Sequence, residues 1–429
     1  MQFLQAFLVG FRSLDKTVLV PIVIFILSLV FRVKPSTAIK SALMFGAGLA
    51  GITIISNYMT AALAPVGTGI IANTGLTNDY MDLGMSPMFA GAVSLPFFLY
   101  LYPIGIVLNM ILIRLRFTKT LLVDFINFAT TSIAAVPVYI ITGNTILTLI
   151  VFAIYFIIEL KIADWTAPMV QSYYGVEGVS IPHPSCGFQA LYVIPLNWLI
   201  DKIPGLNKID FNMADVRSKL GIFGEPSVIS FVIGFVLAMI AGLGIVQSLY
   251  VGMSLVAVML LFPKAIGLLM EALAPISKGI KAYYKQKYGD EMSDLYMGMD
   301  AAIFSGYPEV VAITAVYIPI VVLLHFILPG VRTLPTGESL QLAIVIGMIV
   351  PFAGTKGKKG NVFRTLLIGI ILASVGLYCS TYCAPIVTAL ARRTGMAAAD
   401  QMVTSMAMRD PQKAFIYWLV RTITGKSGL

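Results

Sequence analysis

Charged side chains are scarce in this sequence. The 29 Lys and Arg residues and the 20 Asp and Glu residues make up 11% of 429 positions and leave a net charge of +9. A soluble domain has about 25% charged residues, and it needs them to cover its surface. The scarcity excludes a soluble enzyme, a disordered chain and a nucleic-acid-binding protein. Because 58% of the residues are apolar, what remains is a polytopic membrane protein.

Cysteine and histidine are also rare. Cys186, Cys379 and Cys383 form no Cys-x-x-Cys pair and indicate no disulfide framework. Two histidines are too few for a metal or redox enzyme. The sequence also contains no Walker A motif, no His-Glu-x-x-His motif and no glycine-rich phosphate loop. We therefore expect no metal, no cofactor and no catalytic residue, and we expect that the chain does not use ATP as its own energy source.

Long runs without charge are present instead. A membrane span needs about 20 apolar residues, and several of these runs are long enough for more than one span. We predict an all-α polytopic membrane protein with about ten spanning helices and some re-entrant segments. The uncharged runs are 41–78, 83–113, 125–158, 178–200, 226–263, 310–331, 339–355 and 365–391.

Glycine and proline interrupt these apolar runs. The sequence has 37 glycines and 22 prolines, and two breaks stand out, at 180–185 (SIPHPS) and at 334–338 (LPTGE). Backbone groups that lose their helical partners inside a bilayer must be satisfied by protein or must line a cavity. Pairs of interrupted segments are the best sequence indication of a transporter's binding site. The breaks thus favour a transporter.

The two halves of the chain are loosely similar. Leu101–Tyr102–Pro103 and Leu261–Phe262–Pro263 each begin a helical run that ends in basic residues. The two broken segments follow at a similar offset, near 155 residues. This pattern predicts one membrane transport domain over 1–429, made of inverted repeats at roughly 15–215 and 220–395, with the substrate at the midplane.

Polar residues inside the apolar segments are the candidate substrate ligands, because burying them in a bilayer is costly. We interpret His183, between two prolines, as a ligand to substrate hydroxyls rather than as a packing residue. Glu225 has two interpretations of equal weight, a site residue or a carboxylate favoured by a helix N-terminus. His325, among apolar neighbours, is interpreted as structural. The other candidates are Asp124, Asn127, Thr130, Gln189, Asp300, Ser305 and Glu338.

These residue types leave two functions open. Carboxylates, amides and imidazole hold the paired hydroxyls of a sugar or polyol, and apolar faces cover its C–H edges. The same residues suit a carrier driven by a proton or sodium gradient. The first function is the recognition of a neutral sugar or polyol, and the alternative is an ion-coupled secondary transporter of a small polyhydroxy solute.

Several stretches in a fixed order resemble one family. The chain is similar to the galactitol-type enzyme IIC, the membrane subunit of a bacterial phosphoenolpyruvate-dependent sugar phosphotransferase system, in the ascorbate–galactitol group. The resemblance extends from the N-terminus to about residue 390, and the order and spacing of its motifs make it specific. The stretches are TVLVPIVI (17–24), GVEGVSIPH (175–183), DKIPG (201–205), FGEP (223–226), VMLLFP (258–263), GMDAA (298–302), LPG (328–330) and LPTGE (334–338).

The resemblance implies a homodimer in the bacterial inner membrane, with a scaffold domain and a mobile core domain that enclose one sugar in each protomer. Movement of the core would give alternating access. The subunit itself would not be phosphorylated. Cytoplasmic IIA and IIB subunits would be its partners, and IIB would phosphorylate the sugar as it emerges. The implied substrate is galactitol or a related hexitol or sugar.

The resemblance also assigns site residues by motif. His183, Asp300 and Glu225 match the family's Ile-Pro-His, Gly-Leu-Asp-Pro-Ala and Phe-Gly-Glu-Pro motifs, and Glu338 stands where the family has Asp. Asp124 and Asn127 match the family's Asp-x-Trp-Asn-x-Trp-His motif. The two tryptophans and the histidine of that motif are replaced here by Ile126, Ala129 and Thr130.

Overall fold

The computed structural model describes residues 16–74, 80–85, 87–88, 91–92, 95–96, 98–122, 125–209, 221–289, 294–304, 307–334, 345, 348–353 and 361–429. Most of these residues are helical, as predicted. The α-helices are α2 (Lys16–Val30), α3 (Pro35–Thr74), α5 (Phe98–Arg114), α6 (Phe125–Ser132), α7 (Val136–Thr142), α8 (Thr145–Tyr174), α9 (Ala190–Lys202), α11 (Pro226–Ile240), α12 (Gly244–Tyr288), α13 (Pro308–Ile327), α15 (Val362–Tyr382), α16 (Ala384–Arg393) and α17 (Pro411–Thr424). Single 3-10 turns are η1 (Ile133–Ala135), η2 (Gly187–Gln189), η3 (Leu206–Lys208), η4 (Gly221–Gly224), η6 (Ala301–Phe304), η8 (Val350–Phe352) and η9 (Met406–Met408).

Four helices in the described part of the chain are long and apolar enough to cross a bilayer. They are Pro35–Leu63, Thr145–Tyr174, Gly244–Leu261 and Val362–Tyr382, and three shorter apolar helices accompany them. A polytopic membrane protein is therefore consistent with the structure. The predicted number of about ten spans remains a prediction.

Helix α8 shows how the sequence makes one of these spans. The Asn144 side chain accepts a hydrogen bond from the backbone N–H of Leu147 and caps the first turn, and Gly175, at φ 67°, ends the helix. One face of the helix is apolar but exposed, which is costly in water and favourable in lipid. The exposed side chains that recur every fourth residue are Ile146, Ile150, Ile154 and Ile158.

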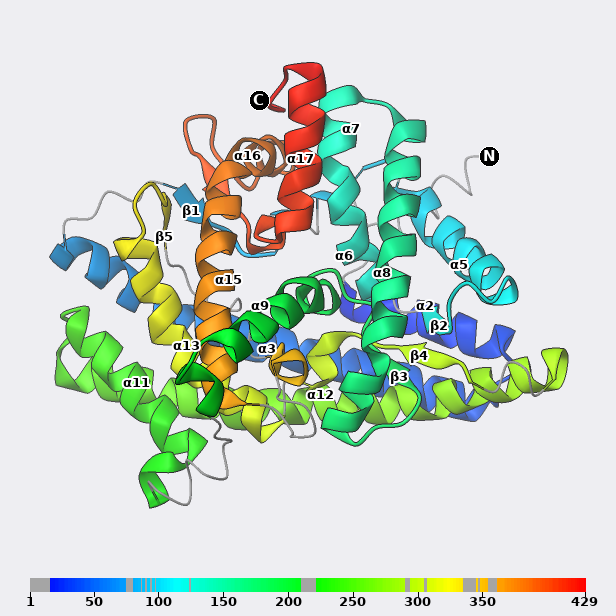
Figure 1. Cartoon of the computed structure of the whole chain (residues 1–429), viewed down its shortest axis with the longest axis horizontal. Helices are drawn as coiled ribbons and strands as arrows, with labels where there is room; N and C mark the ends of the chain where they lie inside the picture. Colours follow the sequence, from blue (N-terminus) through cyan, green and yellow to red (C-terminus); the bar gives the residue numbers. More distant parts are fainter. Residues whose placement is uncertain are drawn as a thin grey trace.

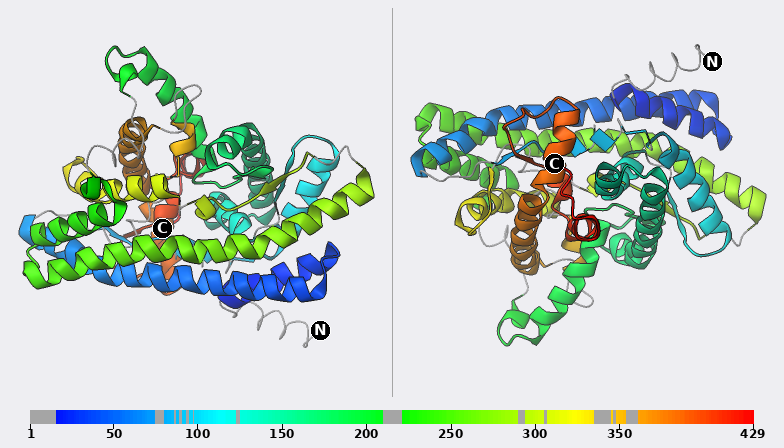
Figure 2. Two further views of the ribbon diagram at one scale, coloured as in Figure 1. Left: turned by 90° about the horizontal axis from the view of Figure 1, so that it is seen from below. Right: turned by 90° about the horizontal axis from the view of Figure 1, so that it is seen from above.

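The two longest helices form a layer across which other helices run. α3 has 40 residues and α12 has 45, and they lie side by side over most of their length (Figure 2). At 1.5 Å per residue they measure about 60 and 68 Å, so each extends well beyond one crossing of a bilayer's ~30 Å apolar core. The axes of α8, α15 and α17 run in a different direction, crosswise to those of α3 and α12 (Figure 1).

In the described part of the chain, six short strands, which the all-α prediction did not include, join distant segments into two parallel sheets. One sheet has the order β5 (Thr333–Leu334), β1 (Tyr80–Asp82), β6 (Val403–Thr404). The other has the order β2 (Thr120–Leu122), β4 (Tyr296–Gly298), β3 (Val179–Ser180). Strands of two or three residues are too short to produce an alternating pattern, so no sequence pattern indicates them.

The central strand β4 needs a glycine. A Cβ atom at Gly298 would lie 2.8 Å from Cγ of Pro182 and 3.1 Å from the carbonyl oxygen of Leu121, so both neighbouring strands would have to move. We predict that Gly298→Ala lowers the free energy of unfolding by about 1–3 kcal/mol and weakens sugar binding, as measured by thermal unfolding and equilibrium binding. Gly267→Ala in α12, where no described atom lies within 4 Å beyond the helix's own backbone, is the matched control and should be at least as stable as the wild type. Equal unfolding midpoints for the two variants would contradict this account of β4.

Candidate functional site

The carboxyl edge of the β2–β4–β3 sheet collects the main candidate residues. β2 leads into α6, which carries Asn127; His183 follows β3 by three residues, and Asp300 follows β4 by two. Because the strands are parallel, their carboxyl ends meet at one edge, where ligands commonly bind in parallel sheets. The imidazole Nε2 of His183 lies 3.9 Å from Oδ2 of Asp300. The fold thus places next to each other two residues that are more than a hundred positions apart.

The loop of His183 fixes the orientation of its ring. Pro182 and Pro184 keep the segment out of a helix, and the backbone N–H of Ser185 donates to Nδ1 of His183 over 3.2 Å. Since Nδ1 accepts, the proton of the neutral imidazole is on Nε2, which faces Asp300. Burial lowers the pKa of His183, and the negative charge of Asp300 opposes this shift. The ring is therefore neutral at pH 7, and it offers a sugar hydroxyl an N–H donor beside a carboxylate acceptor.

Aromatic packing holds the segment that follows Asp300. The ring of Phe304, at the end of η6, stacks on Tyr174 with 3.9 Å between centroids. The hydroxyl of Tyr307 donates to the backbone carbonyl of Tyr174 over 3.0 Å. These contacts attach the β4 loop to the end of α8 and position the carboxylate.

Three further candidates are buried. Asn127 is fully buried, and its side-chain amide has no hydrogen-bond partner among the described residues. Oε1 of Gln189, in η2, also has none in the described part of the chain. Thr130 donates to the backbone carbonyl of Asn127 over 2.9 Å. Unpaired amide groups are the kind of donor and acceptor that sugar hydroxyls can satisfy.

The remaining candidates are Glu225 and three residues that lie outside the described structure. Glu225 is half-buried at the N-terminal end of α11, where a carboxylate favoured by a helix N-terminus would lie. Its side chain makes no capping hydrogen bond there. Asp124, Ser305 and Glu338 lie outside the described residues.

Sequence reasoning missed a set of polar residues on α17. Asp410 and Lys413 are buried, with 2.7 Å between Oδ2 and Nζ, and Ser185 Oγ donates to the same Oδ2 over 2.7 Å. Gln412 Nε2 donates to the carbonyl of Pro184 over 2.8 Å. In the sequence they belong to a mixed-charge stretch, RDPQK at 409–413, which is typical of a solvated segment. Only the fold shows that they face the His183 loop.

Glu159 is a second missed residue. It lies in α8 at 1% exposure, and its Oε2 accepts a hydrogen bond from Thr131 over 2.8 Å. Its Oε1 has no partner among the described residues. The sequence did contain a signal for Glu159, which directly follows the uncharged run 125–158. A carboxylate inside an apolar helix of 30 residues is a candidate functional residue.

His325 lies on α13, and its Nδ1 is 2.6 Å from the backbone carbonyl of Val321, one turn earlier in the same helix. The side chain is buried, so we predict that His325→Ala lowers the free energy of unfolding by about 1–3 kcal/mol while sugar affinity stays unchanged. Titration of the purified variant with sugar checks this, and a large loss of affinity would show that the structural interpretation is wrong.

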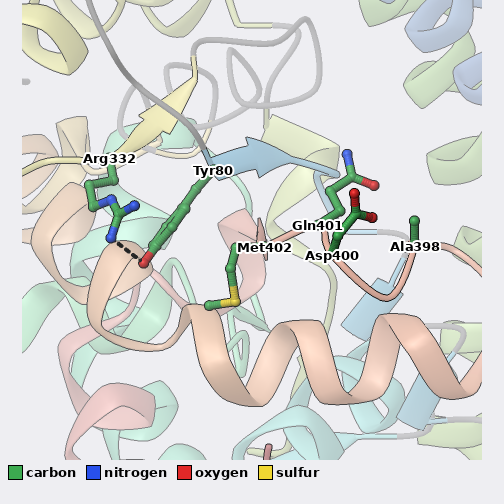
Figure 3. Close-up of a pocket in the computed structure, with 6 residues that line it drawn as sticks. All are labelled: Tyr80, Arg332, Ala398, Asp400, Gln401 and Met402. Carbon is green, nitrogen blue, oxygen red and sulfur yellow. Dashed lines mark hydrogen bonds between the residues drawn. The ribbon is translucent and has the colours of Figure 1, made fainter.

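An open pocket of about 640 Å³ lies at the amino ends of the β5–β1–β6 strands. Figure 3 shows the guanidinium of Arg332 donating to the hydroxyl of Tyr80, over 2.8 Å. Asp400, Gln401 and Met402 form part of the opposite wall. Among the candidate sugar ligands that the structure describes, none lines this pocket.

Comparison with known proteins identifies the family. A family model described as "PTS system sugar-specific permease component" matches residues 12–401. The chain is 30% identical over 412 residues to the galactitol-specific EIIC component of the PTS system of Escherichia coli strain K12, with 95% of this chain and 88% of the relative covered. The corresponding protein of Escherichia coli O157:H7 matches to the same extent.

These matches confirm the predicted resemblance and the bacterial inner membrane as the location of a multi-pass protein. They give no support to the ion-coupled alternative. The chain belongs to the family of sugar-specific permease components of the phosphotransferase system.

Proposed function

We propose that this chain carries galactitol, or a closely related hexitol, across the inner membrane and presents it to a cytoplasmic IIB subunit for phosphorylation. The observation that carries the proposal is the meeting of His183 and Asp300 at the carboxyl edge of one parallel sheet, 3.9 Å apart and largely buried. An N–H donor beside a carboxylate acceptor matches neighbouring hydroxyls on a polyol.

The surrounding residues complete a site for an uncharged polyol. Asn127 and Gln189 contribute amide groups, and Thr130 contributes a hydroxyl. Asp124, Glu225, Ser305 and Glu338 are further proposed ligands, assigned from the sequence. The site needs no metal and no cofactor, because a neutral polyhydroxy solute is recognised by paired hydrogen bonds. No residue of the chain is proposed to react with the sugar, so the phosphoryl group comes from the partner subunit.

Galactitol is the first proposed substrate because the names of two relatives specify it. The two curated proteins named above are called galactitol-specific, and the match covers nearly all of this chain. The replacements Ile126, Ala129 and Thr130 fall beside Asn127, so they are where a preference for another hexitol would arise.

We also propose that the fold consists of two inverted repeats, at roughly 15–215 and 220–395, with about ten spans shared between a scaffold and a mobile core. Element order supports this. The hairpin α2–α3 corresponds to α11–α12, and Val30 and Ile240, which end the first helices of the two hairpins, are 210 positions apart. Arg114 and Ile327, which end α5 and α13, are 213 positions apart. This separation differs from the offset near 155, which paired Leu101 in α5 with Leu261 in α12.

Strand pairing supports the repeats independently. β1 of the first repeat pairs with β5 of the second repeat and with β6, which follows the end of the second repeat, and β4 of the second repeat pairs with β2 and β3 of the first, always in parallel. Tyr80 is opposite Thr333 in one sheet, and Tyr296 is opposite Thr120 in the other. Exchanging the halves reproduces the same pairing. We propose that two such chains form a homodimer, as the family resemblance implies.

Uptake of radiolabelled galactitol tests the function. Cells that express this chain with matching IIA and IIB subunits should accumulate galactitol phosphate, and omission of IIB should abolish the accumulation. Chromatography of the intracellular label separates phosphate from free sugar. Free galactitol that accumulates without the partner subunits would contradict the proposal and would favour an ion-coupled carrier.

A further inference from the structure

We propose that the C-terminal helix α17 sets the hydrogen-bonding state of His183, with Asp410, Gln412 and Lys413 acting as positioning residues through the loop Pro184–Ser185. This inference deepens the proposed function and rests on it, since it concerns the same sugar site. The three residues lie C-terminal to the part of the chain that matches the family model.

The contacts between α17 and the loop are numerous and buried. Asp410 Oδ2 receives Ser185 Oγ–H over 2.7 Å and lies 2.7 Å from Lys413 Nζ. Nζ of Lys413 also lies 3.4 Å from Ser185 Oγ and donates to the carbonyl of Ala407 over 3.1 Å. Lys413 and Asp410 are 1% and 4% exposed, so water does not replace these partners. A buried and hydrogen-bonded ion pair of this kind holds its neighbours in one geometry.

Gln412 adds a second attachment. Its Nε2 donates to the carbonyl of Pro184 over 2.8 Å, and its Oε1 accepts from the hydroxyl of Tyr192, in α9, over 3.1 Å. The residues on both sides of the Pro184–Ser185 peptide bond are therefore held by the same turn of α17. The nitrogen of this peptide bond belongs to Ser185, and its N–H donates to Nδ1 of His183.

The consequence for His183 is a single tautomer. With Ser185 N–H directed at Nδ1, the proton of the neutral ring is on Nε2, on the side of Asp300. If the loop were released, the proton would be shared between the two nitrogens, and the donor would face the sugar only part of the time. His325 provides an internal reference with the opposite tautomer, because its Nδ1 faces a carbonyl, which can only accept.

Nitrogen NMR of ¹⁵N-histidine-labelled protein tests this without any sugar, since the chain has two histidines. His325→Ala assigns the signals by leaving His183 alone. The wild type should show Nδ1 of His183 as an unprotonated, pyridine-type nitrogen. Ser185→Ala, and the charge-neutral double variant Asp410→Ala with Lys413→Met, should lose this single state and bind galactitol about tenfold more weakly.

Two matched variants complete the design. Ser185→Thr keeps the hydroxyl and should keep both the wild-type spectrum and the affinity. Thr422 lies on α17, and among the described residues its hydroxyl bonds only to the Trp418 carbonyl of the same helix, so Thr422→Ala should change neither. A wild-type tautomer in both Ser185→Ala and the double variant would overturn the inference. Unchanged binding by His183→Ala would instead overturn the sugar-binding role of His183, so the two failures are distinguishable.

Discussion

The single variants His183→Ala and Asp300→Ala should each weaken galactitol binding by about 1–3 kcal/mol, because each change leaves a polar group of the closed site without its partner. This corresponds to about a 5- to 150-fold rise in the dissociation constant. The two side chains lie 3.9 Å apart at the carboxyl edge of β2–β4–β3 and are proposed to bind the same pair of hydroxyls. Isothermal titration of purified variants in detergent measures the loss.

The design of this experiment separates binding from folding. The double variant His183→Ala with Asp300→Ala should lose less than the sum of the single losses, because residues that share one ligand group are not additive. His325→Ala provides the matched control, as it removes the chain's other buried histidine. Wild-type affinity in folded His183→Ala and Asp300→Ala proteins would remove both residues from the site.

Asp82→Ala should destabilise the protein by about 3–5 kcal/mol, because it leaves the Arg409 guanidinium buried without its carboxylate. Oδ2 of Asp82 lies 2.5 Å from Nη2 of Arg409, and their side chains are 0% and 2% exposed. Oδ1 of Asp82 also accepts from the Gly84 backbone N–H over 2.6 Å. The pair connects β1 with the start of α17. The midpoint of thermal unfolding in detergent, without sugar, measures the effect.

A compensating variant distinguishes the cost of the unpaired charge from the loss of packing. Asp82→Leu with Arg409→Met removes both charges and should regain most of the stability lost in Asp82→Ala. Asp201→Ala is the comparison at a more exposed position. Asp201 is half exposed and lies 2.6 Å from Nη1 of the buried Arg364. Nη1 would keep its hydrogen bond to Asn197 Oδ1, so loss of the Asp201 carboxylate should cost less. An unfolding midpoint of Asp82→Ala equal to that of the wild type would contradict the account.

Much of the fold class was readable from the sequence because a bilayer imposes length and polarity on every span. The uncharged run 125–158 contains α6, α7 and the first half of α8, and the break at SIPHPS is a loop in the structure, as its prolines predict. These signals are local, so a single stretch of sequence contains them.

What the sequence did not indicate depends on contacts between distant segments. β3 has two residues, and its register against β4 brings His183 to Asp300; no periodic pattern can reveal such a strand. Asp410 and Lys413 have the composition of a solvated helix end, and only the packing of α17 on the Ser185 loop buries them. Their environment is set by the tertiary fold, which local propensity does not encode.

We propose that the sugar binds at the carboxyl edge of the β2–β4–β3 sheet, against His183. The dipolar coupling between ¹³C-galactitol and ¹⁵N-histidine in proteoliposomes tests this directly, using His325→Ala so that one labelled histidine remains. Bound galactitol should couple to Nε2 of His183, and this coupling should disappear when unlabelled galactitol is added in excess. Bound galactitol without any coupling to this imidazole would show that the sugar binds elsewhere in the chain.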